Sequence, residues 1–125
     1  MKPALRLVLP LPFLLMCLPA QAYEVQTGPV MICDTQKQVE RFAQVFDGDL
    51  RIAFSAINDE EKNPSACGVV DAAYVQGPEL GVARGGSHAF RIIPIVVVAA
   101  DTPAGYRAAE PALFFTLVEV EEYAV

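Results

Sequence analysis

The sequence has no tryptophan, a single histidine (His88) and few basic side chains. Its 9 Lys and Arg residues stand against 15 Asp and Glu, a net charge of −6 that argues against a nucleic-acid binder held by phosphate contacts. The chain has 125 residues, which fits one ordinary domain, and its 54% hydrophobic content argues against disorder. These figures indicate a single folded domain with an acidic surface.

Motifs for catalysis and for ligand binding are also missing. Ser87 and His88 are neighbours, so on a strand their side chains point to opposite faces, and no G-x-S-x-G motif is present. The Asp-Gly-Asp segment 47–49 begins like a calcium loop, but the position that needs glycine is Ile52. The glycine-rich stretch 77–86 fits neither phosphate-binding pattern. The sequence therefore predicts no catalytic residue, no cofactor and no metal.

The first 22 residues are typical of a secretory signal peptide. Lys2 and Arg6 precede the uncharged run Leu7–Leu18, and the segment 20–22 has the small-x-small pattern at which signal peptidase cuts. We expect cleavage before Tyr23 and a periplasmic or secreted protein.

Two alternatives concern this leader. A membrane anchor needs about 20 apolar residues, and Pro10, Pro12 and Pro19 would disturb such a helix. A lipoprotein acylated at Cys17 needs a small residue before the cysteine, where Met16 stands. The prediction is therefore a cleaved leader with no membrane span in the mature chain.

Cleavage leaves one domain, residues 23–125, with 7 basic and 15 acidic side chains and a net charge of −8. It also leaves two cysteines, Cys33 and Cys67, which an exported protein is expected to oxidise. Closing this loop of 34 residues should stabilise the fold by about 3–4 kcal/mol. A redox-active pair is the rival interpretation, but such pairs usually have C-x-x-C spacing.

The segment 35–58 predicts a helical hairpin. Thr35 and Gln38 fit a capping box, Gly48 suits the end of a first helix, and Asp49 suits the N-cap of a second. Apolar side chains recur at i, i+3, i+4 and i+7, which predicts one buried face on each helix. These side chains are Val39, Phe42, Ala43 and Phe46, followed by Leu50, Ala53, Phe54 and Ile57.

A charged turn is predicted at 58–64, after which the hydrophobic period changes to two. The most apolar segment, 89–100, indicates a central buried strand, except that Pro94 lacks a donor and predicts a bulge or an edge position. Residues 23–28 are expected to fray, and the other predicted strands are 29–32, 67–75 and 113–123.

The predicted fold class is α+β, with an N-terminal helical hairpin packed on a mainly antiparallel sheet of three to four strands. A small SH3-like barrel that carries a helical insert is the alternative. The disulfide should join the start of the first helix to the start of the first long strand.

The connection 101–112 supplies the candidate interaction residues. Thr102 followed by Pro103 is a helix-start signal, so one or two helical turns could present Tyr106 and Arg107. Tyrosine and arginine are frequent anchors of protein interfaces. In a simple meander this connection would share the disulfide end of the sheet, while the loop 76–88 would lie at the other end.

Three segments of the mature chain resemble a group of small exported proteins of alpha-proteobacteria that carry no assigned function. They are Cys33–Phe42 (CDTQKQVERF), Ala66–Val69 (ACGV) and Thr102–Gly105 (TPAG). The resemblance implies export and the cysteine pair, and it implies no activity, ligand or catalytic residue.

Two functional hypotheses follow. The first is a non-catalytic binding domain of the cell envelope, whose partner is an envelope protein or polymer and which uses neither nucleic acid nor a cofactor. The second is a small hydrolase or an inhibitor-type module that uses a carboxylate near the disulfide end, Asp34 or Asp101.

Overall fold

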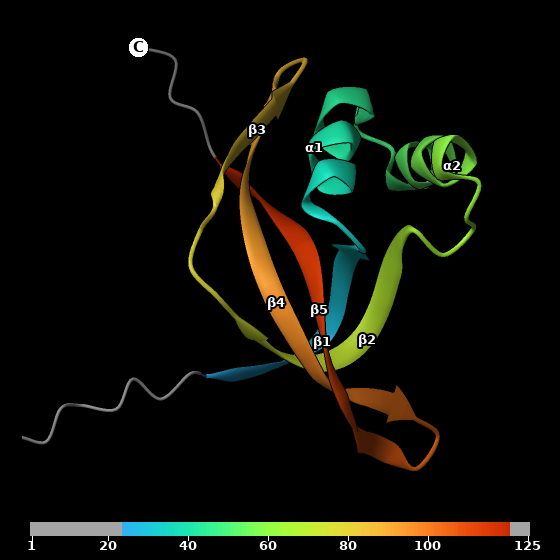
Figure 1. Ribbon diagram of the computed structural model, residues 1–125, viewed down its shortest axis with the longest axis vertical. Coiled ribbons are helices and arrows are strands. Elements are labelled where there is room, and N and C mark those ends of the chain that lie inside the picture. Colours follow the sequence, from blue (N-terminus) through green and yellow to red (C-terminus); the bar gives the residue numbers. More distant parts are fainter. Residues whose placement is uncertain (1–23, 121–125) are drawn as a thin grey trace, which may run out of the picture.

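A computed structural model describes residues 24–120 (Figure 1). The expected signal peptide, Cys17 and the last residues of the strand predicted at 113–123 lie outside this range. Along the chain the elements are β1 (Val25–Cys33), α1 (Gln36–Val45), α2 (Leu50–Glu61), β2 (Cys67–Gln76), β3 (Gly81–Gly85), β4 (His88–Thr102) and β5 (Gly105–Val120). The α+β class is confirmed, with five strands instead of the three or four expected.

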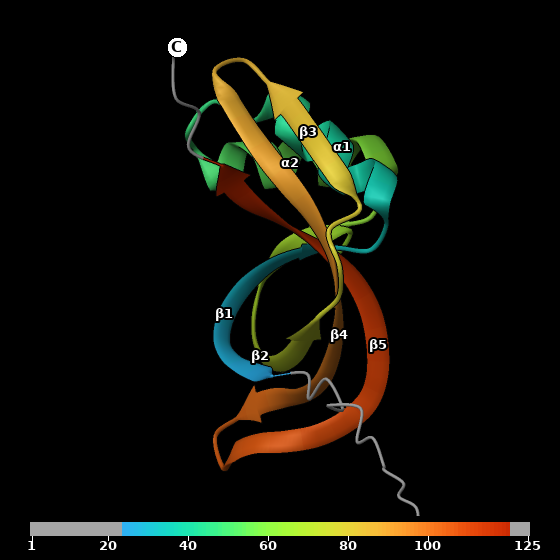
Figure 2. The ribbon, with the colours of Figure 1, turned by 90° about the vertical axis from the view of Figure 1, so that its left-hand side faces the viewer.

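The sheet is antiparallel and curls back on itself. Its strand order is β2-β1-β5-β4-β3, and a further ladder joins β2 to β4. The ladders β1–β2, β2–β4, β4–β5 and β1–β5 therefore form a ring, which β1 and β5 close through the pair Cys33 and Phe115. This closure, with both helices inserted between β1 and β2, is nearer to the barrel alternative than to an open sheet (Figure 2).

Each face of the sheet has its own hydrophobic core. Inside the ring, Ile93 and Ile95 of β4 pack with Ile32 and Tyr74. On the outer face, the neighbouring side chains Phe90 and Ile92 pack against the helices. The outer core includes Cys33, Val39, Phe42, Ala43, Ala53, Ile57 and Cys67. The alternation along β4 therefore explains why this strand is apolar on both sides.

The helices begin as predicted. The Thr35 hydroxyl accepts a hydrogen bond from the Gln38 N–H at 3.1 Å, and the Gln38 side chain accepts one from the Thr35 N–H at 3.0 Å. Asp49 caps α2 by accepting from the Arg51 N–H at 2.9 Å. The apolar stripe is less regular than expected, because Leu50 is 44% exposed.

The ends of the helices differ from the prediction. Helix α1 ends at Val45 with an extended C-cap at Phe46, so Gly48 lies beyond its end although its φ is +113°. Helix α2 continues to Glu61, into the predicted charged turn, and ends at Lys62 in the left-handed conformation. The helix continues through residues 59–61, whose side chains are exposed, while the Asn58 side chain turns toward the start of β2.

Two strands begin well before the residues predicted. Strand β1 starts at Val25, not at 29, because residues 25–33 all pair with β2. Strand β5 starts at Gly105, where one or two helical turns were expected. The helix-start signal fails because Thr102 instead closes a tight turn, in which its Oγ1 accepts from the Ala104 N–H at 3.1 Å and donates to the Gly105 carbonyl at 2.7 Å.

Pro29 and Pro94 each lie where the backbone nitrogen of the strand has no ladder partner to bond. The Pro94 carbonyl accepts from the Gly77 N–H at 2.8 Å, so the Pro94 nitrogen faces the link between β2 and β3, where no ladder donor is needed. Cys33 and Cys67 have a Cα–Cα distance of 4.1 Å, which is typical of a non-hydrogen-bonded pair. Pro29 is four residues before Cys33 on β1, so its backbone groups point to the same side as those of Cys33. Its nitrogen therefore also faces away from β2. Pro94 thus occupies a local edge, one of the two predicted possibilities.

Candidate functional site

The β4–β5 hairpin carries Tyr106 and Arg107, and it lies at the opposite end of the molecule from the helices (Figures 1 and 2). Residues 103–111 are all exposed. The connection therefore does not share the disulfide end, because the strands curve around the ring instead of running as a flat meander.

Tyr106 holds this hairpin against the barrel. Its hydroxyl donates a hydrogen bond of 2.6 Å to Asp71 Oδ1 on β2, although the residue remains 44% exposed. This bond, followed by partial desolvation and the negative charges of Asp71 and Asp101, raises the pKa of Tyr106, and a hydrogen bond with Thr27 opposes the rise. A single phenol thus connects β5 with β2 and β1.

Arg107 lies on the other face of the hairpin. It follows Tyr106 directly in β5 and pairs with Ala100, whereas Tyr106 pairs with Asp101. Adjacent residues of a strand point to opposite faces. The structure therefore presents Tyr106 and Arg107 on two separate surfaces, each of which is exposed.

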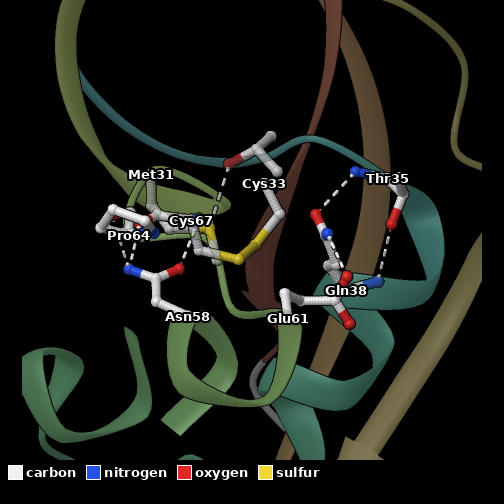
Figure 3. The surroundings of a disulfide bond; sticks show 9 residues. Met31, Cys33, Thr35, Gln38, Asn58, Glu61, Pro64 and Cys67 are labelled. Carbon is white, nitrogen blue, oxygen red and sulfur yellow. Dashed lines mark hydrogen bonds between the residues drawn. A yellow bond between two sulfur atoms is a disulfide. The ribbon is translucent and has the colours of Figure 1, made fainter. Parts of the chain in front are cut away.

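The disulfide Cys33–Cys67 is confirmed and joins the end of β1 to the start of β2 (Figure 3). Asn58 of α2 adds a second connection beside it. The Asn58 side chain accepts from the Cys67 N–H at 2.9 Å and donates to the carbonyls of Cys67 and Pro64 at 3.2 and 3.1 Å. The sequence placed Asn58 in a charged turn and did not indicate this role, because its partners become neighbours only when α2 meets β2.

A polar groove of about 380 Å³ runs between α1 and α2. The polar side chains that line this groove pair across it, from α1 to α2. Gln38 donates to Glu61 at 3.0 Å, and Arg41 Nη2 lies 2.9 Å from Glu60 Oε2. The Arg41 hydrogen bond lowers the pKa of Glu60, and the same bond raises the pKa of Arg41. These pairings join the two helices at the surface of the groove.

His88 lies where the β3–β4 turn meets helix α1. Its Nδ1 is 2.8 Å from Glu119 Oε2, and its ring packs edge-on against Phe46 with centroids 5.0 Å apart. Gly85 of the same turn touches the backbone of Ala43 so closely that a side chain there would overlap the Ala43 carbonyl. The glycine-rich connection therefore supports α1 and contains the short strand β3.

The two carboxylates proposed for hydrolysis occupy different ends of the domain. Asp34 follows β1 beside α1, and its N–H donates to the Ala66 carbonyl at 3.0 Å. Asp101 ends β4 in the hairpin, remote from the disulfide, so the expected proximity is wrong for this residue (Figure 1). Among residues 24–120, no three His, Cys, Asp or Glu side chains are grouped as a metal site.

Comparison with known proteins gives no relative: no family model, curated protein or solved structure matches the chain. The resemblance to exported alpha-proteobacterial proteins therefore stays a prediction. Neither helix in the described part of the chain has the length and apolarity that a membrane crossing requires.

Proposed function

We propose that this protein is an exported, non-catalytic domain that binds a macromolecule of the cell envelope through its β4–β5 hairpin. The observation that carries the proposal is a hairpin end that is exposed over residues 103–111 yet pinned to the barrel by the bond from Tyr106 to Asp71. A pinned surface loses little conformational freedom on binding, which favours affinity.

Two further features support this assignment. The disulfide Cys33–Cys67 is buried, and disulfides persist in oxidising compartments such as the periplasm. The sequence of residues 1–22 is typical of a signal peptide. Export is tested by the intact mass of the protein recovered from an envelope fraction, which should correspond to residues 23–125 less two protons. A mass that retains the leader with free thiols would contradict export.

Binding is tested by capture of envelope components on immobilised protein. Tyr106→Ala and Arg107→Ala, separately and together, should weaken capture of at least one component, and the single variants should show which face of the hairpin binds. Arg91→Ala is the matched control, because Arg91 is an exposed arginine of β4 outside the hairpin end. An unchanged set of captured components for the double variant would show that the hairpin is not the binding surface.

A further inference from the structure

Beyond the helices, the outer face of the sheet carries a row of apolar side chains, one from each strand of the ring. Val25 of β1 pairs with Val75 of β2, Val75 with Val96 of β4, and Val96 with Leu113 of β5. Residues directly opposite in a sheet point to the same face. Val25 is 58% exposed, Val96 37% and Leu113 57%, and Val75 is half-buried. We call these four residues the apolar row.

Two carboxylates lie on the same face, nearer to the tip of the β4–β5 hairpin. Asp71 and Val75 are four residues apart in a regular stretch of the β1–β2 ladder, so their side chains share a face. Asp101 of β4 pairs with Tyr106 of β5, whose hydroxyl donates to Asp71. The charges of both carboxylates act on the phenol of Tyr106, and all three residues are exposed. We call Asp71, Asp101 and Tyr106 the acidic row.

The negative charge of the acidic row is not balanced on this face. Between the two rows lie the paired residues Thr27, Ala73, Ala99 and Ala108. None of the residues that the ladders place in these three rows is basic, and Arg107 lies on the opposite face. Within residues 24–120, neither Asp71 nor Asp101 takes part in an ion pair. The only partner of the Asp71 carboxylate is a neutral phenol.

This unbalanced charge distinguishes between possible occupants of the face. Two carboxylates beside an exposed tyrosine suit an ammonium or a guanidinium group, which carboxylates attract and an aromatic ring also binds. A second copy of this chain, with its net charge of −6, would bring negative charge against the acidic row, and so would an anionic lipid surface. The apolar row requires apolar side chains in the same partner. The face therefore fits a partner that is both basic and apolar.

The two rows also set the spacing that such a partner must have. Val75 and Asp71 are separated by four residues of β2, which is about 13 Å at about 3.3 Å per residue. An extended segment with apolar side chains at one end and basic ones about four residues away reaches both rows at once.

We infer that the apolar row and the acidic row together form a docking surface for a basic, amphipathic segment of another protein. Its apolar side chains occupy the apolar row, and its lysine or arginine side chains bind the acidic row. The inference rests on the proposed function in that it names the binding face and the class of partner for the same end of the domain.

The test is fluorescence anisotropy of a labelled synthetic peptide of about twelve residues, with leucines in one half and lysines in the other, titrated with the protein recovered from the envelope fraction. The wild type should bind this peptide. Replacing its lysines by glutamate, or its leucines by serine, should each weaken binding about tenfold or more. Added salt should weaken binding as well, because the acidic row is exposed.

Variants of the protein locate the binding surface. Asp71→Asn with Asp101→Asn should raise the dissociation constant about fivefold at low ionic strength, because two exposed charge pairs are lost while an acceptor for Tyr106 remains. Leu113→Ser should raise it about tenfold through lost apolar contact.

Matched controls change the same chemistry elsewhere on the domain. Asp47→Asn with Asp59→Asn removes two exposed carboxylates of the helix end and changes the net charge equally. Val82→Ser alters a valine that is 50% exposed on β3, outside both rows. Both controls should bind the peptide as the wild type does. Circular dichroism and the retained disulfide establish that each variant is folded, and the altered peptides test the inference on the wild type if a variant unfolds.

A wild type that does not bind the leucine and lysine peptide would overturn the inference. Equal affinity for the glutamate or the serine peptide would also overturn it, and so would a loss in the control variants as large as in the variants of the two rows. Self-association of the wild type that Leu113→Ser abolishes would assign the face to a second copy and refute the inference.

Failure of the inference can be told apart from failure of the proposed function. If the peptide does not bind but Tyr106→Ala or Arg107→Ala still weakens capture of an envelope component, the inference is wrong and the proposed function stands. If the peptide binds as expected while capture is unchanged in the double hairpin variant, the docking surface is supported and the proposed function is wrong.

Discussion

The two ends of this domain use the same sheet in different ways. At one end, α1 and α2 cover the outer face, and the buried core there includes Val39, Phe42 and Ile57. At the other end, the outer face is open, and the hydrogen bond from Tyr106 to Asp71 links the exposed end of the β4–β5 hairpin to β2. Burial of apolar surface is the main stabilising contribution in a domain of this size, so stability should be concentrated at the helix end.

We therefore expect the helix end to determine stability and the hairpin end to determine binding. Substitutions at the helix end should lower the free energy of unfolding, whereas substitutions at the hairpin end should alter binding and leave the fold largely intact. Four variants test this division, in order of decreasing expected effect.

Removal of the disulfide should have the largest effect on stability. Cys33→Ala with Cys67→Ala opens a loop that spans 34 residues and should lower the free energy of unfolding by about 3–4 kcal/mol in the chain-entropy model. Urea denaturation of the variant and of the oxidised wild type measures this difference. Equal stabilities would show that the helix end holds together without its covalent link.

Gly85→Ala should be the next most damaging change. A Cβ at this position would overlap the Ala43 carbonyl and force β3 away from α1, at a cost of about 1–3 kcal/mol. Gly81→Ala at the other end of β3 is the control, because a Cβ there has no heavy atom within 4 Å. If both variants unfold at the same temperature, β3 does not support the helix.

Asn58→Ala removes three hydrogen bonds between α2 and the start of β2. Two involve the backbone of Cys67, so their loss leaves polar groups unsatisfied beside the disulfide and should cost about 1–3 kcal/mol. Asn63→Ala, which removes one local bond to Ser65 at 2.9 Å, should cost less in the same denaturation experiment. A larger loss for Asn63→Ala would assign the connection to the turn instead of to Asn58.

Tyr106→Phe should have the smallest effect on stability, because it acts at the hairpin end on an exposed side chain. The pKa of Tyr106 is raised above its ordinary value of about 10, chiefly by its hydrogen bond to Asp71. The neutral phenol is therefore favoured in the folded state. Its contribution is fully present below the ordinary tyrosine pKa and is lost as the pH rises through the raised one.

The measurement is a spectroscopic titration of tyrosinate in the wild type and in Tyr106→Phe. The difference between the two curves should show one group that ionises at a higher pH than free tyrosine. A difference curve at the ordinary pKa would mean that the hairpin is not pinned in solution. A large loss of stability at neutral pH would contradict the division between the two ends.

Local sequence signals were reliable where they depend on neighbouring residues. The capping box of Thr35 and Gln38 and the cap at Asp49 are present as predicted, because each bond joins residues two or three apart. The cysteine pair was likewise predictable, because only two cysteines follow the leader. The helix-start signal at Thr102 failed since the same hydroxyl can close a turn between strands, and ladder pairing of β4 with β5 decided between the two outcomes.

The sequence by itself determined the acidic character of the chain, the helical hairpin, the partners of the disulfide and the strands rich in β-branched residues. These depend on composition, on side-chain period and on contacts within a few residues. Tertiary structure alone decided the closure of the ring, the role of Asn58 and the bond from Tyr106 to Asp71. Each of these depends on strand register between distant segments, which is fixed only when the whole sheet buries its two faces together.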